Sequence, residues 1–69
     1  MEAKIRAMLE SGELSFKDAV PRRKGIPAHS VGKIHLLAIE HANETGEPPA
    51  ACITKACCIY WRLFEEKKR

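Results

Sequence analysis

The stretch CITKACCIYWRLF, residues 52–64, decides the fold. On a helix that turns about 100° per residue, its apolar side chains cover an arc of roughly 200°, about twice the apolar stripe of an ordinary surface helix. One neighbouring helix cannot cover such an arc. We therefore expect a helix over about 49–67 that is either central to a bundle or shared between two subunits, with Pro49 in its first turn.

The small size of the core favours the shared arrangement. The chain has 69 residues, and nine of them are Ala and three are Cys, so little large apolar surface remains to be buried. We expect a homodimer that pairs through this last helix. The predicted interface residues are Ile53, Cys57, Tyr60, Trp61 and Phe64.

The segment before residue 21 predicts two helices. Residues 2–11 repeat apolar side chains at helical spacing and are followed by a glycine. Residues 15–20 offer Ser15 as an N-cap and Asp18 at the third helical position. Because Pro21 disfavours helical geometry in the residue before it, this second helix must be short.

A further helix is expected over about 28–45, after the loop PRRKGIP and before a glycine and two prolines. One of its apolar residues, Leu36, lies among the polar side chains instead. Its apolar side contains Val31, Ile34, Leu37, Ala38, Ile39 and Ala42. The predicted fold is thus a single all-α domain over residues 1–69, with four helices of which the second is short.

Charge and cysteine content narrow the class of protein. The net charge is +3, and basic residues cluster at 22–24 and 67–69, which admits a nucleic-acid partner. No apolar run is long enough to cross a bilayer, and no export signal is evident, so we expect no membrane association. An odd number of cysteines, crowded into residues 52–58, favours a reducing compartment. We expect the cytoplasm, or the nucleus if the source is eukaryotic or viral.

The cysteines do not have the spacing of a metal site. On a helix, Cys52 and Cys57 point roughly 140° apart and Cys57 and Cys58 roughly 100° apart, whereas structural zinc takes short-spaced pairs on one face or one turn. We therefore expect no metal and no cofactor. The sequence also contains no nucleophile elbow and no glycine-rich phosphate loop, so we expect a protein that is not an enzyme.

Residues 25–34, GIPAHSVGKI, resemble the turn and recognition helix of helix-turn-helix DNA-binding proteins. In that family a glycine makes the turn, a proline opens the second helix, and apolar residues such as Val31 and Ile34 pack inward. The resemblance is confined to this half of the motif. It implies that Ala28, His29, Gly32 and Lys33 face the major groove, and that the preceding basic residues lie near phosphates.

These features predict a non-enzymatic regulatory protein that binds DNA or RNA. The basic loop and the start of the following helix would contact the phosphate backbone, and the residues involved are Arg22, Arg23, Lys24, His29 and Lys33. The alternative is an adaptor or inhibitor that binds a partner protein through an apolar helix, with Tyr60 or Leu36 in the contact. Salt distinguishes the two, because it weakens phosphate contacts steeply and apolar contacts hardly at all.

Overall fold

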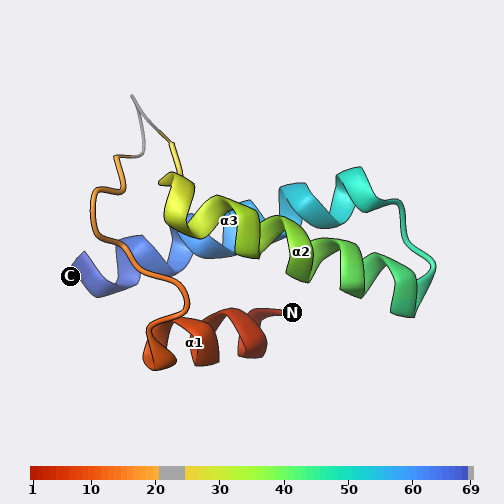
Figure 1. The fold of residues 1–69 in the computed structure, drawn as a ribbon, viewed down its shortest axis with the longest axis horizontal. Coiled ribbons are helices and arrows are strands. Elements are labelled where there is room, and N and C mark those ends of the chain that lie inside the picture. The colour runs from red at the N-terminus through yellow and green to blue at the C-terminus, as the bar shows by residue number, and fades with distance from the viewer. Residues whose placement is uncertain (21–24, 69) are drawn as a thin grey trace.

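Three helices make up the part of the chain that the computed structural model describes, residues 1–20 and 25–68. They are α1 (Glu2–Ser11), α2 (Ala28–Thr45) and α3 (Pro49–Lys68). Figure 1 shows α2 and α3 lying side by side in opposite directions, with α1 packed beside α3. The all-α class is confirmed. None of the helices in these described ranges is both long and apolar enough to cross a membrane.

The helix boundaries follow the local signals in the sequence. Gly12 and Gly46 end α1 and α2 with φ of 90° and 77°, in the left-handed region that glycine adopts without strain. The N–H of Gly46 donates to the carbonyl of Ala42 at 2.8 Å. Pro27 precedes α2 and Pro49 opens α3, and the expected bounds of all three helices are confirmed to within one residue.

The prediction of a short helix over 15–20 is wrong. Residues 12–20 form turns and irregular backbone, so the described chain has three helices rather than four. Ser15 does accept the N–H of Lys17, at 3.0 Å, as an N-cap would. Asp18 then adopts a φ of 64°, which is left-handed and ends any helical continuation.

The backbone of Ser15 is bound by α2 and α3 instead of by a helix of its own. Its carbonyl accepts the hydroxyl of Tyr60 at 2.6 Å and lies 3.2 Å from the hydroxyl of Ser30, which also accepts the Ser15 N–H at 3.2 Å. Neither Tyr60 nor Ser30 has any exposed surface. Buried hydroxyls need hydrogen-bond partners, and the non-helical Ser15 backbone provides them.

The wide apolar arc of α3 is covered by α1, by α2 and by the irregular segment between them. Phe16 places its ring edge-on to Tyr60 and Phe64, with centroids 5.1 and 5.4 Å apart. Trp61 packs in the same way against Tyr60 and Phe64, at 5.2 and 5.5 Å. Edge-to-face pairs of this kind add stability beyond the area they bury. A single chain therefore covers much of a surface that the sequence assigned to a second subunit.

The core draws on every element of the fold. Leu36 is 63% exposed, as its position among polar residues predicted. Ile39 was expected on the apolar side of α2 but is 42% exposed, because it lies at the edge of the stripe that α3 covers. The buried apolar residues are Ile5, Leu14, Ile34, Leu37, Ala38, Ala42, Cys52, Ala56, Tyr60 and Leu63.

We expect the phenol of Tyr60 to link stability to alkaline pH. Burial raises the pKa of Tyr60 above its ordinary value of 10.0. The phenol of the unfolded chain ionises first as pH rises through about 10, so stability is complete below that pH and declines above it. Tyr60 is the one tyrosine in the chain, so absorbance at alkaline pH reports its titration directly.

Tyr60→Phe is the control for this prediction. It should lower the free energy of unfolding at neutral pH by about 1 kcal/mol, because the bond to Ser15 is lost. It should also make the alkaline decline shallower than in the parent. A phenol that titrates at or below its ordinary pKa while the helices remain intact would contradict the expectation.

Candidate functional site

The amino end of α2 has no side-chain cap. Pro27 is the N-cap residue of its first turn. The amides of Ser30 and Val31 both donate to the carbonyl of Pro27 at 2.9 Å. That first turn also contains no acidic residue. A helix end of this kind carries partial positive charge and favours anions.

The outer side of this helix end is the surface that the helix-turn-helix resemblance assigned to nucleic acid. Its neighbours on the inner side, Ser30 and Ile34, have no exposed surface. Val31 is half-buried. The exposed residues that the resemblance assigned to this side are Ala28, His29, Gly32 and Lys33. We call these four residues the α2 face.

His29 is held by hydrogen bonds at both ring nitrogens. Nε2 lies 3.1 Å from the carbonyl of Lys17, and Nδ1 lies 3.1 Å from the hydroxyl of Ser30. Since a carbonyl only accepts, Nε2 carries a proton in this arrangement. The imidazole is exposed, yet its main contact is with the turn over residues 15–18, which it fixes to α2.

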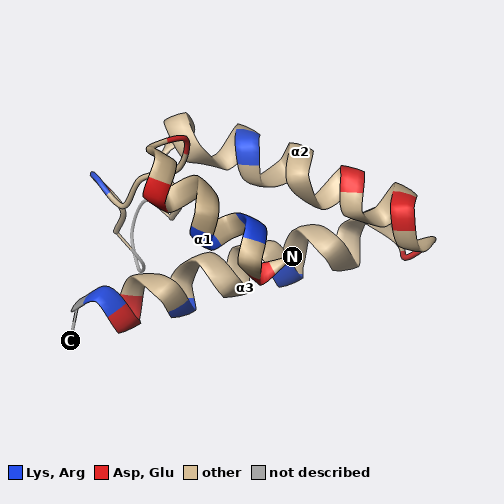
Figure 2. Ribbon diagram, turned by 90° about the horizontal axis from the view of Figure 1, so that it is seen from below, with Lys and Arg blue, Asp and Glu red and all other residues tan. Residues whose placement is uncertain are grey.

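The other predicted phosphate contacts are Lys33 and the three basic residues of the loop before α2. Arg22, Arg23 and Lys24 lie outside the described residues. Lys33 is exposed and borders a hollow of about 460 Å³ between α1 and α2. Both basic and acidic residues occur on each of the three helices, as Figure 2 shows. Lys33 is the one Lys or Arg in α2.

The hollow beside Lys33 combines an apolar floor with a balanced charged rim. Leu36 contributes to the floor although it is 63% exposed. Two lysines and two glutamates surround it. The full lining is Lys4, Ala7, Met8, Glu13, Lys33, Leu36, Leu37 and Glu40.

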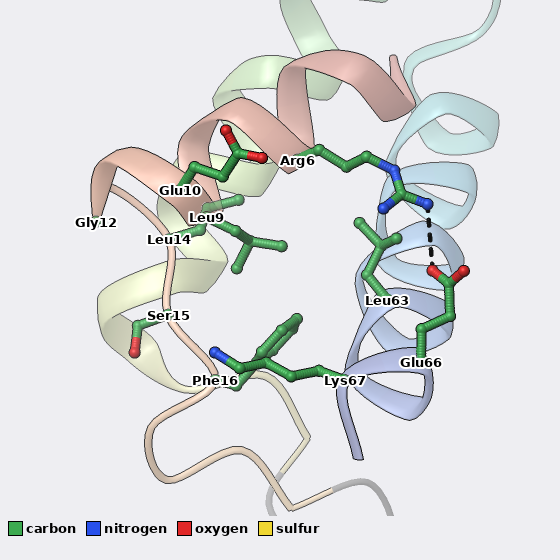
Figure 3. A pocket seen from close by; sticks show the side chains of 10 residues that line it. All are labelled: Arg6, Leu9, Glu10, Gly12, Leu14, Ser15, Phe16, Leu63, Glu66 and Lys67. Carbon is green, nitrogen blue, oxygen red and sulfur yellow. Dashed lines mark hydrogen bonds and ion pairs between the residues drawn. The ribbon is translucent and has the colours of Figure 1, made fainter. Parts of the chain in front are cut away.

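A larger hollow, about 650 Å³, lies between the end of α1, residues 12–16 and the last turns of α3 (Figure 3). Across its opening, Arg6 binds Glu66 at 3.2 Å. The ammonium of Lys67 lies 5.8 Å from the centre of the Phe16 ring. Arg6, Glu66 and Lys67 of this lining thus contact other parts of the chain.

The predicted dimer residues fall into two groups. Ile53, Cys57, Trp61 and Phe64 form a half-buried stripe along α3. Tyr60 has no exposed surface, so it is a core residue of the single chain and offers nothing to a second subunit.

Three side chains that the sequence did not bring together meet where α2 turns into α3. Glu47 Oε2 lies 3.1 Å from His41 Nε2 and 3.7 Å from Cys52 Sγ. The hydrogen bond from Lys55, together with one from Thr45, lowers the pKa of Glu47. Burial, together with the negative charge of Glu47, raises the pKa of Cys52. The cluster is therefore a carboxylate that faces a protonated thiol and an imidazole.

The signal for this cluster lies in the turn rather than in the helices. Residues 46–49, GEPP, reverse the chain, so side chains one turn before and one turn after it come together. Cysteine spacing within one helix carries no information about such a site.

Comparison of the chain with known protein families, with curated proteins and with solved structures finds no match.

We expect the three thiols to react with a disulfide reagent in the order of their exposure. Cys58 is exposed, Cys57 is half-buried and Cys52 is buried. Burial also raises the pKa of Cys57 and of Cys52, which reduces their thiolate fraction. Modification of the folded, chelator-treated chain should show Cys58 fastest and Cys52 slower by about an order of magnitude or more.

Cys58→Ser supplies the control, because it should remove the fast phase and leave the slow ones. A fast phase that persists in this variant, or that disappears in Cys52→Ala, would contradict the expected order.

Proposed function

We propose that this chain is a small regulatory protein that binds DNA or RNA through the α2 face and the basic loop before it. The observation that carries the proposal is the amino end of α2, which is exposed, lacks a side-chain cap and has no acidic residue in its first turn. Lys33 adds an exposed cation on the same side, and the chain enters the helix from the run Arg22-Arg23-Lys24.

These groups suit phosphate rather than base edges. Backbone N–H groups and helix ends fix phosphate oxygens, and lysine acts as a point charge beside them. The α2 face has few side chains that read bases, because both ring nitrogens of His29 already bind the chain itself. Binding should therefore depend on backbone charge and shape more than on sequence.

Removal of cations from this surface should weaken binding to every nucleic acid alike. We expect Arg22→Ala combined with Arg23→Ala to reduce the slope of log affinity against log salt by about one to two units, and Lys33→Ala to reduce it by about one. Duplex DNA, duplex RNA and single strands at two salt concentrations, followed by fluorescence anisotropy, would measure this.

Lys55→Ala is a matched control, because Lys55 binds Glu47 at the opposite end of α2. It should leave affinity for nucleic acid unchanged. Parent protein that binds no nucleic acid at low salt, or a double arginine variant that binds as well as the parent, would refute the proposal.

A protein partner is the second candidate, and the exposure of Leu36 in the lining of the α1–α2 hollow favours it. An amphipathic helix fits such a surface, with its apolar side on Leu36 and its charges opposite the rim. Binding of this kind would change little with salt and would be lost in Leu36→Ser, whereas phosphate binding would survive that change.

We also propose that α3 pairs two copies of the chain through the half-buried stripe of Ile53, Cys57, Trp61 and Phe64. These residues pack against the core on one side, and a second copy would bury the rest of their surface. Sedimentation equilibrium at micromolar concentration should give twice the 7.7 kDa mass of the chain.

Ile53→Glu should yield a folded monomer, because it places a charge at the pairing surface. Thr54→Glu, on an exposed position next to it, should remain a dimer. A parent protein that sediments as a stably folded monomer would overturn this part of the proposal.

A further inference from the structure

The cluster at the α2–α3 turn brings three different metal-binding atoms into one place. Nε2 of His41, a carboxylate oxygen of Glu47 and Sγ of Cys52 all lie within 4.8 Å of one another. They come from three segments: the last turns of α2, the connection, and the first turn of α3. The ligand atoms converge because the chain reverses direction between the two helices.

The carboxylate is held in a fixed orientation. Glu47 Oε1 accepts the ammonium of Lys55 at 3.1 Å, so Oε2 is the oxygen that faces the imidazole and the thiol. The Glu47 N–H donates to Thr45 Oγ1 at 3.3 Å, which fixes the backbone beneath the side chain. Groups that hold a ligand from behind in this way are typical of built metal sites.

Two of the three separations between the ligand atoms are close to those around a small tetrahedral ion. Around zinc, tetrahedral nitrogen and oxygen ligands lie about 3.3 Å apart and oxygen and sulfur ligands about 3.6 Å apart. The observed separations are 3.1 Å from His41 to Glu47 and 3.7 Å from Glu47 to Cys52. The third separation, from His41 to Cys52, lies within 4.8 Å.

The donor set also selects the kind of metal. Calcium and magnesium require oxygen ligands, whereas zinc accepts nitrogen, oxygen and sulfur together. Cys52 is fully buried and forms the inner wall, while the side chains of His41 and Glu47 are 27% and 37% exposed and leave a path from solvent.

We propose that His41, Glu47 and Cys52 bind one Zn²⁺ ion, with water in the fourth position. Binding replaces the thiol proton of Cys52, which is released to solvent. The proton that His41 Nε2 donates to Glu47 also leaves Nε2, and the neutral ring carries its proton on Nδ1, so that the Nε2 lone pair binds the metal. The ion would join the end of α2 to the start of α3. This site is separate from the α2 face, and its test involves no nucleic acid.

Cobalt titration of the full, reduced chain tests the site, because Co²⁺ bound to a thiolate absorbs in the near ultraviolet and tetrahedral Co²⁺ absorbs strongly in the visible. We expect one equivalent of Co²⁺ to bind and one equivalent of Zn²⁺ to displace it. Zinc should also raise the melting temperature, since a ligand that binds the folded state stabilises it.

Variants separate this site from incidental thiol binding. Cys52→Ala should abolish the thiolate band. Lys55→Ala, which removes the partner of Glu47, should weaken cobalt binding by about tenfold. His41→Gln, which spares the buried core, should weaken it at least as much. The matched controls Cys58→Ser and His35→Gln alter exposed residues outside the cluster and should bind as the parent does.

Two results would overturn the proposal. One is a parent chain that shows no thiolate–cobalt band with an excess of the metal. The other is a band that survives both Cys52→Ala and His41→Gln, or that is lost in Cys58→Ser, because the metal would then be bound elsewhere.

Discussion

The backbone of Ser15 is the point on which the rest of the structure depends. It receives the hydroxyl of Tyr60 from α3 and exchanges hydrogen bonds with the hydroxyl of Ser30 from α2. Both side chains are fully buried, and a buried hydroxyl needs hydrogen-bond partners such as these. The contact also places Phe16, the next residue, against the aromatic rings of α3. The backbone of one residue thus ties together the two long helices and the segment before them.

This contact explains why the short helix predicted over 15–20 does not form. The bounds of α1, α2 and α3 are predictable because glycine and proline act on neighbouring residues, and those signals stand beside each helix end. The segment over 15–20 has a local signal as well, the Ser15 cap. The carbonyl of Ser15 instead accepts a hydrogen bond from the hydroxyl of Tyr60, 45 residues further along the chain. A local pattern contains no information about so distant a competitor, and the tertiary contact prevails.

Part of the surface could also be predicted, because helical spacing is a local signal. Helical spacing alone places Gly32 and Lys33 outward and Ile34 inward, as the structure has them. Spacing does not reveal that His29 is bound at both nitrogens. Nor does spacing within one helix reveal a cluster whose members lie on either side of a turn, although the run GEPP marks that turn plainly.

The attachment of α1 differs in kind from that of the other helices. Ile5 is its one fully buried residue, and Met8 and Leu9 pack against the core while partly exposed. Surface ion pairs, Arg6 with Glu66 and Glu2 with Arg62, also link α1 to α3. Exposed pairs contribute little and weaken with salt. The domain therefore has a hierarchy of local opening in which α1 detaches at a lower free energy than the α2–α3 pair separates. Each such opening exposes the side of α3 around Leu63, so α1 protects part of the apolar surface of α3 only while it stays packed.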